Sequence, residues 1–258
     1  MPLIPLANAE IEVDLIDVKS TLAPIVFLHE GLGSVAMWRG RGGYWPELVC
    51  RATRRNGVVY SRRGYGQSSS ILDVRGTNRL LPDYMHQEAW KTLPELLTTL
   101  QIENPVLLGH SDGATIALLF ASRFQTSAGI AMAPHVMVED ISIRSIEAAK
   151  LAYESGDLKS RLSKFHKDVD CAFWQWNDVW LSSAFRSFDI REECRQIDGP
   201  VLAIQGRQDA YGTLQQIQDI APKGNIERKV IENCGHSPHR DQPDETLAYV
   251  NAFLADKA

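Results

Sequence analysis

Three residue types that act together in nucleophilic catalysis occur at separated points of this sequence. Ser111 stands at the centre of the pentapeptide Gly109-His110-Ser111-Asp112-Gly113, and Asp209 and His236 each follow a segment with the pattern of a strand. A serine hydroxyl becomes a nucleophile when a histidine removes its proton and an acidic side chain orients that histidine. The sequence therefore contains candidates for a nucleophile, a base and an acid.

The pentapeptide lies where a strand pattern changes to a helix pattern. The apolar run 105–108 ends at Gly109, and helical periodicity begins after Gly113. A serine at the tip of a sharp turn stands clear of a sheet, and glycines two residues to either side let neighbouring backbone approach closely. This is the G-x-S-x-G layout of an exposed nucleophile. Three small residues also occur together by chance, so the assignment depends on the other elements.

Strand patterns alternate with helix patterns through most of the chain. This alternation predicts an α/β fold, with a doubly wound, mostly parallel sheet flanked by helices. The expected strands cover residues 10–18, near a sheet edge, and 24–28, 57–61, 105–108, 128–134, 200–205 and 227–231. The expected helices cover residues 46–54, 83–100, 114–118 and onward, 214–220 and 244–254.

The alternation stops between residues 135 and 190, where only helical patterns occur, over 138–155 and 157–182. We expect residues 1–134 and 191–258 to form the core domain, and residues 135–190 to form a helical cap inserted into it. Asp209 then lies just past the carboxyl end of a core strand. In open α/β sheets that edge carries the chemistry.

An aromatic stretch at residues 173–180 holds three of the six tryptophans. Phe173, Trp176 and Trp180 share one helix face, which favours anchoring of the cap to the core. As the alternative, one or two of these rings line a substrate pocket. The pocket candidates are Trp174, Trp176 and Asn177, with His166 as a further source of polar contacts.

The loop His29-Glu30-Gly31-Leu32-Gly33-Ser34 directly follows a buried strand. Such a loop can present backbone N–H groups to a developing negative charge, as an oxyanion hole requires. A plain strand-to-helix turn is the alternative. Arg62 and Arg63, in a second glycine-containing loop, could bind an anionic substrate, although arginines beside glycines more often brace a loop.

Composition excludes several classes of function. The 258 residues are 44% hydrophobic and carry a net charge of −5, which provides no basic field for nucleic acid. No run approaches the roughly 18 apolar residues of a membrane span, and residues 1–8 lack the basic start of a secretory leader. The four cysteines form no C-x-x-C pair. We expect a cytoplasmic protein without a metal or cofactor, acting on a small molecule.

Five motifs occur in an order that resembles a serine hydrolase of the α/β-hydrolase superfamily with a helical cap. They are residues 29–34, 63–68, 109–113, 206–209 and 235–236. The resemblance implies a sheet of about eight strands. It also implies that Ser111 is the nucleophile, that His236 is the general base and that Asp209 orients it. The oxyanion hole would be formed by the backbone N–H groups of Gly31 and Asp112.

Two positions depart from the pattern of that superfamily. Glu30 stands where glycine is common, and Ser61 stands where aspartate is frequent. Because an inward carboxylate would repel an oxyanion, we expect Glu30 to turn away or to pair with an arginine. The alternative is a role for Glu30 in the substrate pocket. His239 is a rival base, but the Gly-His pair at 235–236 fits the resemblance better.

The predicted activity is that of a cofactor-independent serine hydrolase. It would cleave a small, apolar carboxylic ester or related acyl compound through an acyl-enzyme. The same site could alternatively support C–C bond hydrolysis, lactone hydrolysis or cofactor-free oxygenation, or the protein could be a ligand receptor with little turnover. A serine at position 111 argues against dehalogenases and epoxide hydrolases, in which the resemblance would require an aspartate there.

Overall fold

A computed structural model describes residues 2–40 and 42–255. The first and last residues of the predicted core domain, residues 1 and 258, lie outside the described residues. One sheet has the strand order β1-β2-β6-β3-β7-β8-β9-β10. The β1/β2 and β2/β6 pairs are antiparallel and all other neighbours are parallel. This confirms the predicted sheet. Its strands are β1 (Leu3–Leu6), β2 (Ala9–Ile16), β3 (Ile25–Leu28), β6 (Gly57–Tyr60), β7 (Val106–His110), β8 (Ala128–Met132), β9 (Val201–Gly206) and β10 (Ile226–Ile231).

The central strands are buried on both faces. Every residue of β3, β6, β7, β8 and β9 is buried, as expected for parallel strands covered by helices on both sides. Strand β1 was not predicted, because four residues that include Pro5 carry little strand signal. It lies at the sheet edge, where a proline without an N–H is tolerated.

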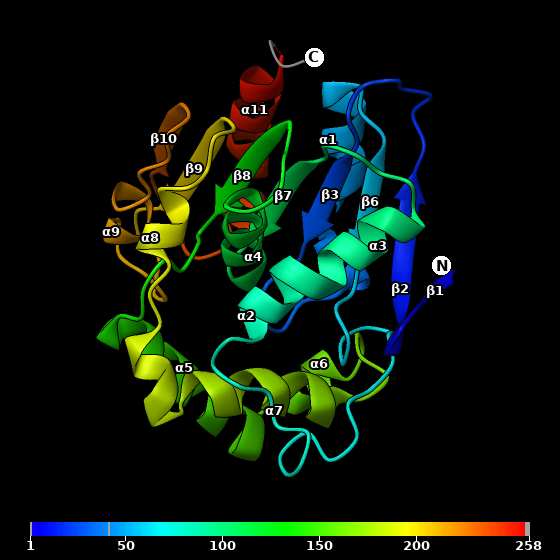
Figure 1. The fold of residues 1–258 in the computed structure, drawn as a ribbon. Helices are drawn as coiled ribbons and strands as arrows, with labels where there is room; N and C mark the ends of the chain where they lie inside the picture. Colours follow the sequence, from blue (N-terminus) through cyan, green and yellow to red (C-terminus); the bar gives the residue numbers. More distant parts are fainter. Residues whose placement is uncertain (1, 41, 256–258) are drawn as a thin grey trace.

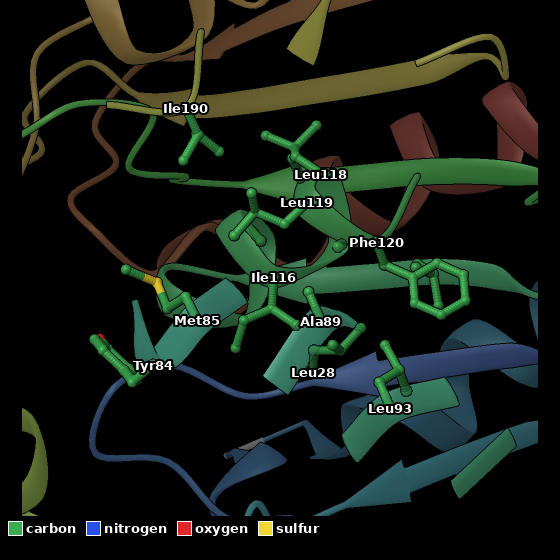
Figure 2. Close-up of a cluster of buried hydrophobic side chains, with 14 of the residues drawn as sticks. Leu28, Tyr84, Met85, Ala89, Leu93, Ile116, Leu118, Leu119, Phe120 and Ile190 are labelled. Atoms are coloured by element: carbon green, nitrogen blue, oxygen red, sulfur yellow. The ribbon is translucent and has the colours of Figure 1, made fainter. Parts of the chain in front are cut away.

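Helices cover both faces of the sheet (Figure 1). Helices α1 (Trp45–Thr53) and α11 (Pro243–Leu254) pack into the hydrophobic cluster on one face. The opposite cluster contains side chains of α2 (Tyr84–Gln87), α3 (Leu93–Thr99) and α4 (Asp112–Ala121), which meet β3 in Figure 2. A π-helical segment (Glu88–Thr92) joins α2 to α3, just before Pro94, which has no N–H for the regular bonding pattern.

Helices α5 (Asp140–Ser155), α6 (Leu158–Leu162) and α7 (Val169–Trp180) lie between β8 and β9 in the chain. Figure 1 shows them as a layer beyond the end of the sheet toward which β3 points. The helix predicted over 157–182 is interrupted at residues 163–168. Asp168 starts α7 there by accepting a hydrogen bond from the Cys171 N–H.

The remaining elements are short connections. They are a 3₁₀ turn (Val35–Trp38), the β4 (Arg39–Gly40) and β5 (Gly43–Tyr44) hairpin, a second 3₁₀ turn (Ser183–Ser187), α8 (Arg191–Cys194), α9 (Gln215–Gln218) and α10 (Pro238–Asp241). No helix in the described part of the chain is long and apolar enough to cross a membrane.

Candidate active site

Ser111 occupies a strained turn between β7 and α4. Its φ of 54° and ψ of −120° lie in a region that residues with a Cβ atom rarely adopt. The turn is held because the Ser111 N–H donates to the Met132 carbonyl at the end of β8, at 2.9 Å. The Ser111 backbone, and with it the hydroxyl, is therefore fixed relative to the ends of β7 and β8.

The two flanking glycines permit close contacts between elements. A Cβ atom at Gly109 would lie 2.1 Å from the Gly113 carbonyl oxygen. A Cβ atom at Gly113 would lie 2.1 Å from the Leu28 carbonyl oxygen of β3. Larger residues at either position would push α4 away from the sheet and displace Ser111.

Ser111, His236 and Asp209 form a continuous chain of hydrogen-bonding groups. The Ser111 Oγ lies 2.9 Å from His236 Nε2, and His236 Nδ1 lies 2.9 Å from each carboxylate oxygen of Asp209. These distances suit proton transfer from the hydroxyl to the imidazole, with the carboxylate orienting the ring. The structure thus brings together three residues that are 125 and 27 positions apart.

The Asp209 carboxylate is held from two further directions. Its oxygens accept hydrogen bonds from the Gln205 side-chain amide at 2.6 Å and from the Tyr211 N–H at 2.7 Å. Burial favours the neutral acid, but the hydrogen bond and charge of His236 outweigh it and lower the pKa of Asp209. The carboxylate is thereby kept ionised beside the base.

The backbone N–H groups of Gly31 and Asp112 have no acceptor among the described residues. Both residues line the cavity in front of the serine. Asp112 is the first residue of α4, where N–H groups lack helical partners and the helix dipole favours negative charge.

Arg62 braces the loop that contains Gly31. Its guanidinium donates to the carbonyl oxygens of His29 at 2.5 Å and Glu30 at 3.1 Å. The backbone N–H of Arg62 donates to His29 Nε2. The Asp112 carboxylate, 3.9 Å from the same guanidinium, accepts a hydrogen bond from Tyr84. These contacts support the bracing interpretation of Arg62, whereas the neighbouring Arg63 is exposed.

Glu30 pairs with basic groups while it lines the cavity. Its carboxylate lies 3.4 Å from His110 Nδ1 and 3.6 Å from the Arg240 guanidinium. Burial alone would raise its pKa, but the hydrogen bond from His110 and the charges of His110 and Arg240 hold the pKa well below the usual range. His110 Nε2 also lies 2.7 Å from the His236 carbonyl oxygen, so Glu30 is linked to the loop of the base.

A carboxylate is present beside Ser61, although Ser61 replaces the aspartate that is frequent there. It belongs to Glu12 of β2, which accepts hydrogen bonds from the Ser61 hydroxyl at 2.7 Å and from the Gln67 N–H at 3.0 Å. The Ser61 hydroxyl oxygen also accepts from the Val35 N–H. Glu12 thus links β2 to the loop after β6, and Ser61 links that loop to the segment after β3.

A cavity of about 200 Å³ opens in front of Ser111. Of the predicted pocket residues, Glu30 and Trp176 line it. Trp174 and Asn177 lie elsewhere: Trp174 packs against Tyr153 and Arg75, and the Asn177 amide donates to the Ile146 carbonyl. The full lining is Glu30, Gly31, Leu32, His110, Ser111, Asp112, His135, Ile146, Trp176, Trp180, Tyr211, His236 and Ser237.

Two histidines that the sequence offers as site candidates, His239 and His166, do not line the cavity. His239 packs against the stacked rings of Trp38 and Trp45, with centroids 4.9 and 5.5 Å away. His166 accepts a hydrogen bond from the Gly66 N–H and lies 3.0 Å from the Leu32 carbonyl oxygen. His166 therefore ties the segment after α6 to two loops of the sheet edge.

Sequence reasoning missed His135 and Tyr211 as residues of this cavity. Both immediately follow features that the sequence did show: His135 comes after β8, and Tyr211 is two residues past Asp209. Their position beyond the carboxyl ends of parallel strands was the available signal. No cluster of three or more potential metal ligands occurs among the described residues.

Comparison with known proteins identifies the family. A sequence model described as "Alpha/beta hydrolase family" matches residues 25–249. The sn-1-specific diacylglycerol lipase ABHD11 of Mus musculus is 23% identical over 274 residues, which span 94% of this chain and 84% of that protein.

Two solved structures have the same fold. A structure from a study of carboxylesterases of Nitrososphaera gargenis aligns with a TM-score of 0.76 and 17% identity, covering 98% of each chain. The enol-lactonase from Burkholderia xenovorans LB400 aligns with a TM-score of 0.71 and 18% identity, covering 99% of this chain and all of that one. These likenesses concern the fold.

Proposed function

Because the chain belongs to the alpha/beta hydrolase family, we propose that it is a cofactor-independent serine hydrolase that cleaves small carboxylic esters through an acyl-enzyme. The observation that carries the proposal is the chain of contacts from Ser111 to His236 to Asp209, with 2.9 Å at each step. The names of the relatives are consistent with hydrolysis of acyl compounds.

In this mechanism the Ser111 Oγ attacks the ester carbonyl carbon while His236 Nε2 accepts the hydroxyl proton. The negative charge on the carbonyl oxygen is stabilised by the free N–H groups of Gly31 and Asp112. His236 then donates the proton to the departing alcohol oxygen, leaving the acyl group on Ser111. A water molecule, deprotonated by His236, releases the acid and restores the serine.

The reaction is tested with Ser111→Ala on p-nitrophenyl acetate. We expect kcat to fall by more than about 10⁴-fold, because the nucleophile is lost while the fold is retained. Ser237→Ala, which removes another cavity serine hydroxyl, is the matched control and should retain most activity. A fluorophosphonate probe should label the wild type and the control but not Ser111→Ala. Normal turnover by Ser111→Ala would refute the assignment.

A further inference from the structure

The cavity in front of Ser111 contains a histidine that the proposed mechanism does not use. His135 lines the cavity and is 2% exposed. Its ring lies 5.6 Å from the His236 ring and packs edge-on against Trp180 at 4.9 Å. The ring nitrogen Nδ1 is buried without a hydrogen-bond partner, and Nε2 forms no hydrogen bond with a described residue. A buried imidazole in that state lacks the partners that burial normally requires.

The backbone of His135 is fixed to the helix that begins after Ser111. The His135 N–H donates to the Thr115 hydroxyl oxygen at 2.9 Å, and that hydroxyl donates to the His135 carbonyl at 3.0 Å. Thr115 itself is fully buried on α4. The imidazole is therefore placed by the same element that places the nucleophile, so its distance to a bound acyl group is set by packing.

The His135 imidazole is neutral near pH 7. Burial and the nearby charge of His236 lower the pKa of His135 to about 3. A neutral imidazole offers one N–H donor and one acceptor, and the proton can reside on either nitrogen. It can therefore bind an uncharged oxygen without adding a charge beside the catalytic base.

The rest of the cavity favours a small, uncharged substrate. Its volume of about 200 Å³ is below the roughly 300–1,000 Å³ usual for ligand pockets. Most of its wall surface is apolar, and no lysine or arginine is among the lining residues. The Trp176 indole N–H and the Tyr211 hydroxyl also have no hydrogen-bond partner among the described residues. The Glu30 carboxylate would repel an anionic substrate, so the cavity favours a neutral one.

We propose that the substrate is a short, uncharged ester carrying a hydrogen-bond-accepting oxygen outside the scissile carboxyl group, and that the His135 imidazole N–H binds this oxygen. This assignment rests on the proposed ester hydrolysis at Ser111. His135 is then a specificity-determining residue and takes no part in the proton transfers.

Two matched ester pairs test the proposal, each exchanging one CH₂ for oxygen. p-Nitrophenyl methoxyacetate is compared with p-nitrophenyl butyrate, and 2-methoxyethyl acetate with butyl acetate. The first pair places the oxygen in the acyl part and the second in the alcohol part. The readout is the ratio of kcat/KM for the oxygen-containing ester to kcat/KM for its methylene counterpart. Comparing this ratio between wild type and variant cancels the difference in intrinsic reactivity of the two esters.

His135→Phe keeps an aromatic ring against Trp180 and removes the hydrogen bond. We expect it to lower the oxygen-to-methylene ratio about tenfold in one of the two pairs. His135→Gln, which retains a donor, should restore most of the ratio. Leu151→Ala, which shortens an exposed apolar side chain of α5 outside the cavity, should leave both ratios unchanged. The thermal unfolding midpoint establishes that each variant folds.

The outcomes separate the two proposals. If His135→Phe lowers kcat/KM equally for both esters of each pair, the imidazole is only a packing residue and the inference is wrong. If His135→Phe does not fold, an unchanged ratio in His135→Asn, whose shorter amide cannot reach the same oxygen, overturns it. If the wild type hydrolyses none of the esters and fails to react with the fluorophosphonate probe, the proposed function itself falls and the inference falls with it.

Discussion

Glu30 combines a position in the oxyanion loop with a fixed negative charge. Its pKa lies well below the usual range despite burial, because His110 and Arg240 stabilise the ionised form. The carboxylate is therefore ionised throughout the pH range in which the enzyme would work. Its partners draw it toward the His236 side of the site, which fits the expectation of pairing with an arginine.

At this scale we predict that Glu30→Gln relaxes selection against anions. Monomethyl succinate and dimethyl succinate differ in one negative charge, and the wild type should prefer the neutral diester. Removing the Glu30 charge should raise the relative kcat/KM for the monoester by about fivefold or more. Asp170→Asn, at an exposed carboxylate paired with Lys159, makes the same change in net charge far from the cavity. An equal change in both variants would rule out a local effect of Glu30.

At the scale of elements, α7 and the loop after β3 meet at Gly31. A Cβ atom there would lie 2.2 Å from the Trp176 indole nitrogen, so the loop and the helix fit only because residue 31 is glycine. This contact joins a candidate oxyanion donor to a helix that comes about 140 residues later in the chain. The position of α7 and that of the Gly31 N–H are consequently coupled.

Gly31→Ala tests this coupling. We expect it to lower the free energy of unfolding by about 1–3 kcal/mol and to reduce kcat/KM, because the methyl group forces the loop and α7 apart. In a Trp176→Leu background the same substitution should cost under about 1 kcal/mol, since the clashing ring is absent. Urea denaturation of the four proteins gives the coupling energy. Additive costs would show that Trp176 is not what limits residue 31.

At the scale of the whole molecule, buried histidines make the fold sensitive to acid. Burial lowers the pKa of His29, His135, His166 and His239 below the ordinary value of 6.5. Below pH 6.5 the unfolded chain binds protons that the folded protein does not. The contribution of these histidines to the free energy of unfolding is therefore fully present above about pH 6.5. It falls as the pH drops toward their folded-state pKa values. Glu30 and Asp209, whose pKa values are lowered, lose their contribution only at lower pH.

His239→Phe tests this account, because the ring keeps its packing on Trp38 and Trp45 while the titrating group is removed. Each such histidine contributes up to about 1.4 kcal/mol per pH unit to the slope of stability between pH 6.5 and its folded-state pKa. Urea denaturation at pH 7.5, 6.0 and 5.0 gives the free energy of unfolding at each pH. Below pH 6.5 its slope against pH should be shallower in His239→Phe than in the wild type by about that amount. His86→Phe, at a half-buried histidine near Glu193, should change the slope less. A variant slope equal to that of the wild type would contradict the account.

The sequence by itself determined the alternation of strands and helices, the turn at Ser111, and the identity of Asp209 and His236 as its candidate partners. These features are local: hydrophobic periodicity, glycines that permit close approach, and polar residues at strand ends. The sequence did not predict β1, because this strand forms through its pairing with β2 and its own residues have little strand propensity. It also predicted one helix where α6 and α7 are separated by residues 163–168.

Only the tertiary structure decided which side chains share the cavity. Trp176 faces Ser111, whereas the neighbouring positions Trp174 and Asn177 face other partners, because the orientation of α7 depends on its packing against distant segments. The same holds for Glu30, whose partners His110 and Arg240 are 80 and 210 positions away. The type of a residue states what chemistry it can do, and the packing of remote elements determines what it meets.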